Sequence, residues 1–387
     1  MVMKRAATAL LVCVVGAAGG RAAAAGDALA NVPSSPSAYD EALARAGGRL
    51  GAEAGRPQAI AALAELATLD EDIAPAALEA ALRRGLGPRA HPLVAAQASY
   101  LLAHVLDERG AGAEAASLRA GLGFLSHPLV IGPFGEGRPS FATAFAPELE
   151  RGPPELGRSY PGKVRDVAWR SGAAALRDGV LYLDGLLRPD DQAVAYVAAL
   201  VRSDRDRPAA LRLGSPGPIK VWVNGAEVFA RDVLRPAALD QDAAPVRLGR
   251  GWNRILIKTV VVDGAWRLYA RLTEPSGAPL RAGVETAAAP PPNAVWAAAP
   301  RAAAASGKTK LATLDTLLAK RAETAAGPTA AAAWLDLARE LAFLAPRDRE
   351  AHAAADAAAR SLALGRSLGA YLVAAEVADT DDERRRD

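Results

Sequence analysis

The stretch IKVWVNGAEVFARD, residues 219–232, places two runs of alternating apolar and polar residues on either side of an Asn-Gly pair. Such a pair is a strong hairpin signal, because both residues can adopt positive φ in a two-residue turn. We therefore predict a β-hairpin with Asn224 and Gly225 at its turn, and this structural role is sufficient to explain both residues. Trp222 lies on the opposite strand face from the apolar residues beside it, so it is either exposed as a ligand contact or covered by a neighbouring segment.

Six further runs near this hairpin are apolar or alternate in the same way, and turn residues separate them at short intervals. The strands expected from this pattern are 180–186, 192–202, 209–215, 219–223, 226–231, 244–249, 253–262 and 265–272. Many short strands with frequent turn signals are typical of an antiparallel β-sandwich or jelly roll.

Helical patterning stands on both sides of the predicted sandwich. Within 39–126, apolar residues recur at three- and four-residue steps, as at Leu78 and Leu82, and breaks containing Gly or Pro separate the runs. Small alanines alternate with bulky residues, which resembles degenerate tetratricopeptide-type helical hairpins, although no regular repeat aligns. The patterning returns at 308–378, where we expect two antiparallel helices joined at 345–348.

The predicted fold is therefore multidomain, with α-helical hairpins, then an antiparallel β-sandwich, then a further helical hairpin region. In chain order, the predicted parts are a signal peptide at 1–25, a linker at 26–38, a helical repeat-like domain at 39–126, the β-sandwich at 127–282, an Ala/Pro-rich linker at 283–307, a helical repeat-like segment at 308–378 and a charged tail at 379–387.

The first 25 residues have the features of an export signal. Lys4 and Arg5 precede an apolar run at 6–18, and the small residues at 22–25 offer cleavage sites of the A-x-A type. The run is short for a membrane span. Cys13 follows Leu-Leu-Val, whereas lipid attachment requires a small residue just before the cysteine, so simple cleavage is favoured over a lipoprotein anchor. We expect a periplasmic or extracellular mature chain without a transmembrane span.

Cleavage changes the composition of the mature chain in two ways. It removes Cys13, which is the only cysteine, so the mature chain would have no disulfide and no thiol nucleophile. It also removes Lys4, Arg5 and Arg21 and no acidic residue, so the formal net charge falls from +3 to zero. A neutral exported protein is not expected to bind nucleic acid.

Motifs that carry catalysis are missing or incomplete. The four histidines do not lie at metal-ligand spacing, and the sequence contains no H-E-x-x-H and no G-x-S-x-G. SGKT at 306–309 copies the end of a phosphate-binding loop, but Ala302 stands where that loop needs its first glycine. We therefore expect a protein that is not an enzyme and that needs no cofactor.

Acidic pairs in two loops between strands are the candidate metal ligands. Asp190 and Asp191 form one pair, and Asp240 and Asp242 form the other. Carboxylates and loop carbonyls suit a structural calcium ion. The alternative is that these are solvated turn residues, since Asp favours local bonds to the backbone.

Three motifs follow one another in the middle of the chain: GPF at 132–134, KVWVNG at 220–225 and GWNRILIK at 251–258. In this order they resemble a galactose-binding-like β-sandwich, over roughly 129–280. That sandwich occurs in exported bacterial proteins beside tetratricopeptide repeats, and in some of them before a transglutaminase-like domain. The resemblance implies a jelly roll related to the sugar-binding modules of glycoside hydrolases, but it does not imply retained sugar binding, because fold does not decide function. Ser215-Pro216-Gly217 stands where relatives commonly carry acidic residues, which weakens a calcium role there.

Three functions remain open from the sequence. The leading hypothesis is an exported, non-enzymatic binding or scaffolding protein whose helical hairpins hold a protein or peptide partner. The alternative is a carbohydrate-binding module for envelope or extracellular glycan, with Trp222 and Trp169 as the sugar-contacting residues. The third is a non-catalytic N-terminal part of a larger transglutaminase-like protein, whose catalytic cysteine the mature chain lacks.

Overall fold

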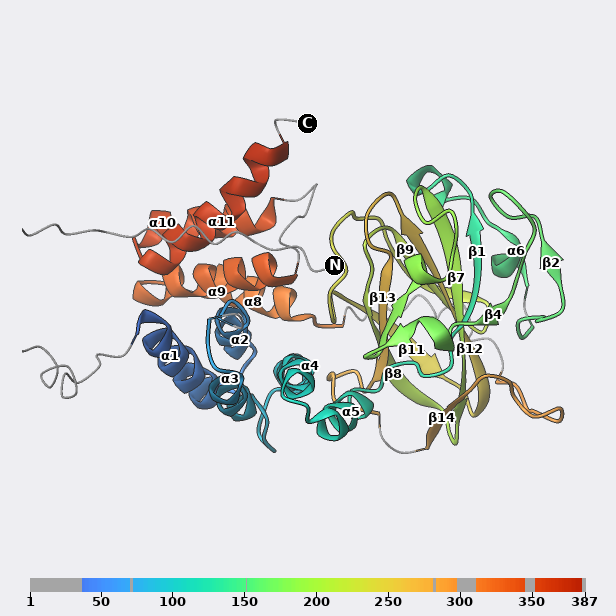
Figure 1. Cartoon of the computed structure of the whole chain (residues 1–387), viewed down its shortest axis with the longest axis horizontal. Helices are drawn as coiled ribbons and strands as arrows, with labels where there is room; N and C mark the ends of the chain where they lie inside the picture. Colours follow the sequence, from blue (N-terminus) through green and yellow to red (C-terminus); the bar gives the residue numbers. More distant parts are fainter. Residues whose placement is uncertain are drawn as a thin grey trace, which may run out of the picture. The chain divides into compact units, whose positions relative to one another are not determined.

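The computed structural model describes residues 37–69, 72–150, 152–280, 283–297, 311–344 and 352–384. Antiparallel β-sheets are packed as a sandwich, with helices before them and helical hairpins after them, which confirms the predicted fold class (Figure 1). Several predicted features lie outside the described residues, namely the signal peptide at 1–25, most of the linker at 26–38, the SGKT stretch at 306–309 and the helix connection at 345–348.

The N-terminal helices begin and end where local sequence signals place them. They are α1 (Ala38–Glu53), α2 (Ile60–Ala67), α3 (Pro75–Leu82), α4 (Pro92–Glu108) and α5 (Gly112–Ala120). Pro75 and Pro92 begin their helices, where a missing N–H costs nothing because the first helical turn has no acceptor for it. Gly110 has a φ of 75° just after α4, a conformation that ends a helix.

The C-terminal helices form two hairpins. They are α8 (Leu314–Thr324), α9 (Pro328–Leu344), α10 (Ala353–Leu364) and α11 (Leu368–Arg384). Thr313 caps α8 through a reciprocal capping box with Thr316. The last helix continues to Arg384, so most of the predicted charged tail at 379–387 is helical backbone.

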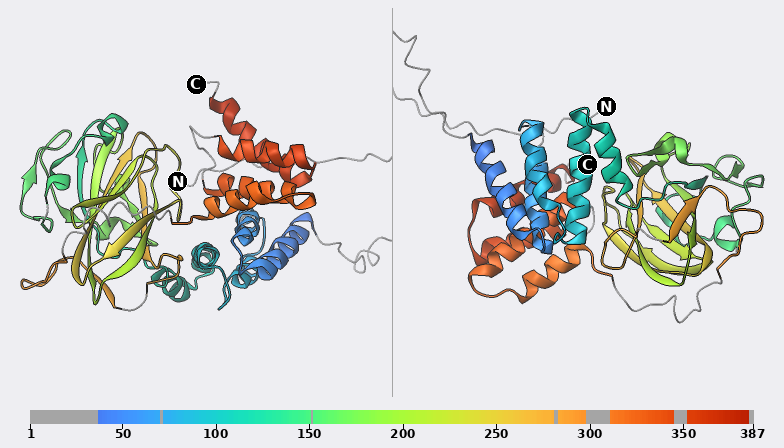
Figure 2. Two further views of the ribbon diagram at one scale, coloured as in Figure 1. Left: turned by 180° about the vertical axis from the view of Figure 1, so that it is seen from behind. Right: turned by 90° about the horizontal axis from the view of Figure 1, so that it is seen from below.

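The two helical regions, which we predicted as separate parts, share one hydrophobic core. Leu50, Leu63 and Leu102 of the first region belong to the same buried cluster as Leu318 and Leu337 of the second. Helix α2 packs directly on α9, and Figures 1 and 2 show the blue N-terminal helices beside the orange C-terminal ones. The helices therefore form a single helical body, and the sandwich is an insertion between its two halves.

The sandwich consists of a seven-stranded and a five-stranded sheet, with a separate two-stranded ribbon. The larger sheet has the order β10-β9-β12-β7-β1-β4, with β14 also pairing with β7. Its strands are β1 (Leu129–Phe134), β4 (Arg170–Ser171), β7 (Ala193–Ser203), β9 (Ile219–Val223), β10 (Ala226–Arg231), β12 (Gly251–Val261) and β14 (Val284–Ala287).

The smaller sheet has the order β11-β8-β13-β6-β5, and all the strand pairs of the molecule that are described are antiparallel. Its strands are β5 (Leu176–Arg177), β6 (Val180–Tyr182), β8 (Arg207–Gly214), β11 (Asp242–Leu248) and β13 (Arg267–Thr273), while β2 (Ser159–Tyr160) and β3 (Val167–Ala168) form the ribbon.

Strand β14 lies inside the range predicted as an Ala/Pro-rich linker. Strand β1 pairs with β7 only from Val194 to Ala198, so the far end of β7 is left open on that side. Residues 284–287 pair with β7 from Leu200 to Ser203 and cover this end. An unpaired strand edge attracts any nearby extended segment, which explains why a weakly patterned stretch becomes a strand here.

The central strands of the seven-stranded sheet, β1, β7, β9 and β12, are buried on both faces. One face packs against the five-stranded sheet, and Val197, Val221 and Ile255 lie in this inner core. The other face is covered by residues 135–150 and 152–169, here called the covering segment, which includes helix α6 (Ala146–Leu149). This second layer determines where both candidate tryptophans lie.

Candidate functional site

Strands β9 and β10 form a hairpin at 219–231, and a two-residue turn joins them. Asn224 has a φ of 50° and Gly225 a φ of 83°, so both turn residues are in the left-handed region. The Asn224 side chain accepts a hydrogen bond from the Arg254 backbone N–H (2.8 Å) and donates one to Oδ1 of Asn253 (2.9 Å). Asn224 therefore attaches the turn to strand β12, in addition to tolerating its backbone conformation.

Trp222 lies on the covered face of the seven-stranded sheet. Its side chain is paired in register with Leu256 on β12, and it is 7% exposed. It belongs to the apolar cluster beneath the covering segment, which also contains Phe134 and Tyr160. The sequence left two alternatives for Trp222, an exposed ligand contact or a residue covered by a neighbouring segment. The structure shows a covered residue, so Trp222 offers no open ring face to a ligand.

Trp169 lies between β3 and β4 and belongs to the same buried cluster as Trp222, but β12, β7 and β1 separate its strand from that of Trp222, so the structure does not bring the two candidate residues together. Trp169 is 4% exposed, and its indole N–H has no hydrogen-bond partner among the described residues. Sugar stacking requires an accessible ring face. In this structure both rings serve as packing between the sheet and the covering segment.

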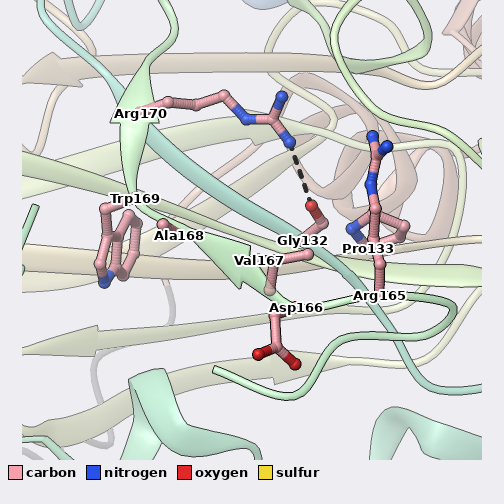
Figure 3. Close-up of a pocket in the computed structure, with 8 residues that line it drawn as sticks. All are labelled: Gly132, Pro133, Arg165, Asp166, Val167, Ala168, Trp169 and Arg170. Carbon is pink, nitrogen blue, oxygen red and sulfur yellow. Dashed lines mark hydrogen bonds between the residues drawn. The ribbon is translucent and has the colours of Figure 1, made fainter. Parts of the chain in front are cut away.

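A shallow cavity of about 300 Å³ opens beside Trp169 (Figure 3). It is lined by Gly132 and Pro133 on β1 and by residues 165–170. Arg170 donates a hydrogen bond to the Gly132 carbonyl (3.3 Å). The side chains of Arg165 and Asp166 are exposed and extend in opposite directions from the turn. The lining of the cavity therefore includes an exposed guanidinium and an exposed carboxylate.

Strand β12 holds the covering segment in place with two buried cations that the sequence analysis did not single out. Lys258 Nζ donates to the carbonyls of Phe141 (3.0 Å) and Thr143 (2.6 Å) and to Oε1 of Glu148 (2.8 Å). Arg254 donates to the carbonyl of Gly152 (2.7 Å) and to that of Glu150. Burial lowers the pKa of Lys258, although the Glu148 carboxylate opposes this effect.

The signal that could have identified these cations is their spacing. Arg254 and Lys258 alternate with Leu256 and lie on the same strand face as Trp222, whereas the residues between them face the inner core. Polar residues on one face normally indicate solvent exposure. The covering segment, which carries the acceptors, is separated from them by about a hundred residues of sequence, so the sequence pattern alone does not show their partners.

The acidic pair Asp190-Asp191 lies at the surface. Asp190 forms an ion pair with Arg188 (3.0 Å), and Asp191 is exposed. An ion pair of this kind contributes about 0–1 kcal/mol to stability.

Asp240 and Asp242 are buried, and arginine partners hold each of them. Asp240 accepts hydrogen bonds from Nε (2.6 Å) and Nη2 of Arg271. Asp242 accepts one from Arg231 (2.7 Å) and another from Arg235. The described part of the chain contains no group of three or more His, Cys, Asp or Glu side chains arranged to hold a metal ion. The geometry assigns both carboxylates a structural role.

A buried polar cluster lies where the sandwich meets the helical body. Gln241 donates to the Leu344 carbonyl at the end of α9 (2.7 Å), and Arg212 on β8 donates to the Ala312 carbonyl before α8 (3.2 Å). Burial lowers the pKa of Arg212 to about 10, and Asp240 only partly offsets this effect. These contacts connect segments that the sequence assigns to different parts of the chain.

Glu340 on α9 is the unusual member of this cluster. Its side chain is fully buried, and neither carboxylate oxygen has a hydrogen-bond partner among the described residues. Burial raises the pKa of Glu340 well above its ordinary value, and the negative charges of Asp315 and Asp240 raise it further. Glu340 is therefore held as a neutral acid at pH values where an exposed glutamate is ionised.

Large apolar side chains are exposed together at the last helical hairpin. Leu364 is 56% exposed, Leu368 75%, Tyr371 50% and Leu372 61%. We call these four residues the terminal face. Scattered apolar residues are normal on a protein surface, but a group of this kind marks an interaction surface.

No helix in the described ranges combines the length and the apolar character needed to cross a membrane.

Comparison with known proteins found no matching protein family and no matching curated protein. Among solved structures, a β-glucosidase from Kluyveromyces marxianus aligns with 38% of this chain and 16% of its own, at 10% sequence identity and a TM-score of 0.25. A GH31 α-xylosidase from Xanthomonas citri aligns with 37% of this chain and 13% of its own, at 11% identity and a TM-score of 0.22. The aligned part is thus a small fraction of either enzyme, and a likeness at this level carries no argument about activity.

Proposed function

We propose that this chain is an exported, non-enzymatic binding or scaffolding protein. In this proposal the tetratricopeptide-type helical hairpins hold a protein partner, and the galactose-binding-like sandwich is a recognition or spacer module. The terminal face carries the proposal, because four large apolar side chains are exposed at one hairpin of the helical body.

The joint between the sandwich and the helical body supports a scaffolding role. The outer face of the five-stranded sheet packs on α4, where the Tyr100 and Tyr269 rings lie 6.1 Å apart. Gln97 on α4 also donates to the Leu239 carbonyl (2.9 Å), and Arg271 donates to the Leu122 carbonyl (3.2 Å). A joint with buried hydrogen bonds restricts the movement of one module against the other, as a spacer requires.

Export is proposed on the sequence alone. The basic start, the apolar run at 6–18 and the small residues at 22–25 are the features that support it. We propose that the mature protein works in the periplasm or outside the cell.

A pull-down from an envelope extract tests the proposed function. The chain without residues 1–25 is immobilised, and the captured proteins are compared with those captured by the same chain after heat denaturation. We expect the folded chain to capture one partner protein in a constant molar ratio. The denatured chain should not capture it. A hydrolytic activity of the purified chain that disappears when one residue is changed would show that the protein is an enzyme, and the proposal would then fail.

Glycan binding is the second candidate, and the cavity beside Trp169 favours it. Arg165 and Asp166 are exposed there, and a guanidinium and a carboxylate are suitable groups to orient sugar hydroxyls. The test is a glycan array probed with the wild-type chain, with Arg165→Ala and Asp166→Ala, and with Arg205→Ala as an exposed control on the same sandwich. Binding that only the first two substitutions abolish would support this candidate.

A further inference from the structure

Over residues 368–377, where its side chains are described, helix α11 has apolar residues on two sides, of which only one is packed. Ala370 and Val373 are buried against the helical body, with Ala374 and Val377 packed beside them. Leu368, Tyr371 and Leu372 lie on the other side and are exposed. A helix that is apolar all round normally has neighbours on both sides, because each exposed apolar side chain leaves surface in contact with water.

The spacing on the exposed side is that of a helix-packing stripe. Leu368, Tyr371 and Leu372 follow one another at i, i+3 and i+4, and Ala375 adds position i+7. Side chains at these steps lie one above another on the same side of a helix. Leu364 is the last residue of α10, and the non-helical residues 365–367 separate it from α11, so it is exposed beside the stripe but is not part of it.

The layers beneath the terminal face show what this surface accepts. Helix α9 packs on α2 on one side and on α10 and α11 on the other. The α9–α10 contact is close: Ser361 donates to the Ala331 carbonyl (2.9 Å), and a Cβ added at Gly365 would lie 3.3 Å from Cβ of Ala331. The α10–α11 hairpin thus packs closely against α9 through its inner side. The terminal face lies on its other side, where a further helix would pack.

Two exposed charges stand at the ends of the stripe. Arg366 precedes α11, and Glu376 follows the last stripe residue. They are ten residues apart in sequence, one before the first turn of α11 and one beyond Ala375. A helix lying along the stripe would be oriented by an acidic residue near Arg366 and a basic residue near Glu376.

We propose that the terminal face binds an amphipathic α-helix of a partner protein, which packs along α11 as the next helix of the succession. This inference rests on the proposed function and adds the position and the chemistry of the partner: a Leu- and Ala-rich stripe at i, i+3, i+4 and i+7, with one acidic and one basic residue at opposite ends.

A designed peptide tests the inference. The probe is a fluorescein-labelled peptide of 20 or so residues with Leu and Ala on one helical face, Gln on the other, and the two end charges. The full chain without residues 1–25 is titrated against it, and anisotropy is measured. We compare wild type with Leu368→Asp/Leu372→Asp and with Leu149→Asp/Val164→Asp, a matched pair of exposed apolar residues on the covering segment.

We expect the Leu368→Asp/Leu372→Asp variant to bind the peptide at least ten times more weakly than wild type and the control variant to bind it unchanged. A scrambled peptide without an apolar face should not bind. Circular dichroism checks that each variant is folded, which we expect because all four side chains point outward. Equal binding by the two double variants, or equal binding of the two peptides, would overturn the inference.

Light scattering and the pull-down separate this inference from the proposed function. If wild type is a dimer and Leu368→Asp/Leu372→Asp is a monomer, the occupant is a second copy and the inference is wrong. If the double variant still captures the envelope partner, the proposed function stands and the terminal face is not its binding surface. If wild type captures no partner, the proposed function fails, whatever the peptide does.

Discussion

Arg49 on α1 forms an ion pair with both carboxylate oxygens of Asp336 on α9, although 287 positions separate the two residues in sequence. Nη2 of Arg49 lies 2.8 Å from both carboxylate oxygens of Asp336, and Arg321 on α8 donates to the same carboxylate at 2.8 Å. Burial alone would lower the pKa of Arg49, but Asp336 and Glu53 outweigh it and raise the pKa. This ion pair links the two helical regions that precede and follow the sandwich in the sequence.

Replacing Asp336 by Asn should destabilise the helical body. Arg49 and Arg321 would lose their shared carboxylate, but both are partly exposed and can be hydrated, so we expect a loss of about 1–3 kcal/mol in the free energy of unfolding. Urea denaturation followed by circular dichroism measures it. The exposed pair Arg202–Glu285 provides the control, since Glu285→Gln should change stability by less than about 1 kcal/mol. Equal effects of the two substitutions would contradict the role assigned to Asp336.

Glu340→Gln should make the protein more stable at neutral and alkaline pH. The folded state raises the pKa of Glu340, so it binds the proton more tightly than the unfolded state does, and stability is lost as pH rises above the unfolded value of about 4.3. The glutamine side chain does not ionise, so the variant does not lose stability in this way. The stability difference between variant and wild type should grow with pH by up to about 1.4 kcal/mol per unit, until the folded-state pKa is passed.

Denaturation curves from pH 4 to pH 9 measure this effect, and Glu323→Gln, an exposed change on α8, is its control. We expect the control to follow wild type at every pH. Asp315 and Asp240 are the charged groups that face Glu340, so Asp315→Asn should reduce the same pH dependence. Parallel curves for wild type and Glu340→Gln would show that Glu340 is ionised in the folded protein.

Trp222→Ala should cost about 3–5 kcal/mol in the free energy of unfolding, because it opens a cavity beneath the covering segment. Leu149→Ala, at an exposed position of the same segment, should cost less than about 0.5 kcal/mol. Thermal and urea denaturation measure both. A stable Trp222→Ala protein that had lost binding to a ligand would instead show that Trp222 is a contact residue.

Lys258→Met should loosen the covering segment. The substitution removes the donor to two carbonyls and the cation beside Glu148, which keeps its hydrogen bond from the Tyr196 hydroxyl. Removing one partner of a buried pair costs about 3–5 kcal/mol. We expect faster proteolytic cleavage within residues 135–150, mapped by mass spectrometry. The double variant Lys258→Met/Glu148→Gln should recover part of the stability, while Lys320→Met, an exposed change, should leave the cleavage pattern as in wild type.

Calcium should not stabilise the protein through Asp240 or Asp242. Their carboxylates are already held by Arg271, Arg231 and Arg235, and a cation would have to displace these partners. We expect the same melting temperature in calcium and in chelator. A calcium-dependent rise in melting temperature that Asp242→Asn abolishes would refute this expectation.

Much of the local structure could be predicted because its causes lie within a few residues. The Asn224-Gly225 pair stands at the expected turn, since only a few residue types tolerate positive φ at both positions. The helices before and after the sandwich follow from apolar periodicity and from prolines and glycines at their ends. The candidate site was less predictable, because it depended on which strand face is covered.

The sequence by itself determined the order of helical and sheet regions and the alternation within each strand, because periodicity and turn conformation are set by neighbouring residues. Only the tertiary structure decided that the two helical regions share one core, that Trp222 and Trp169 are both buried, and that Lys258 and Arg254 bind the covering segment. The shared core and the two buried cations depend on contacts between segments roughly a hundred or more residues apart. Which distant surface covers a given face is decided by the burial of apolar area and the pairing of buried charges throughout the molecule, and no local pattern encodes it.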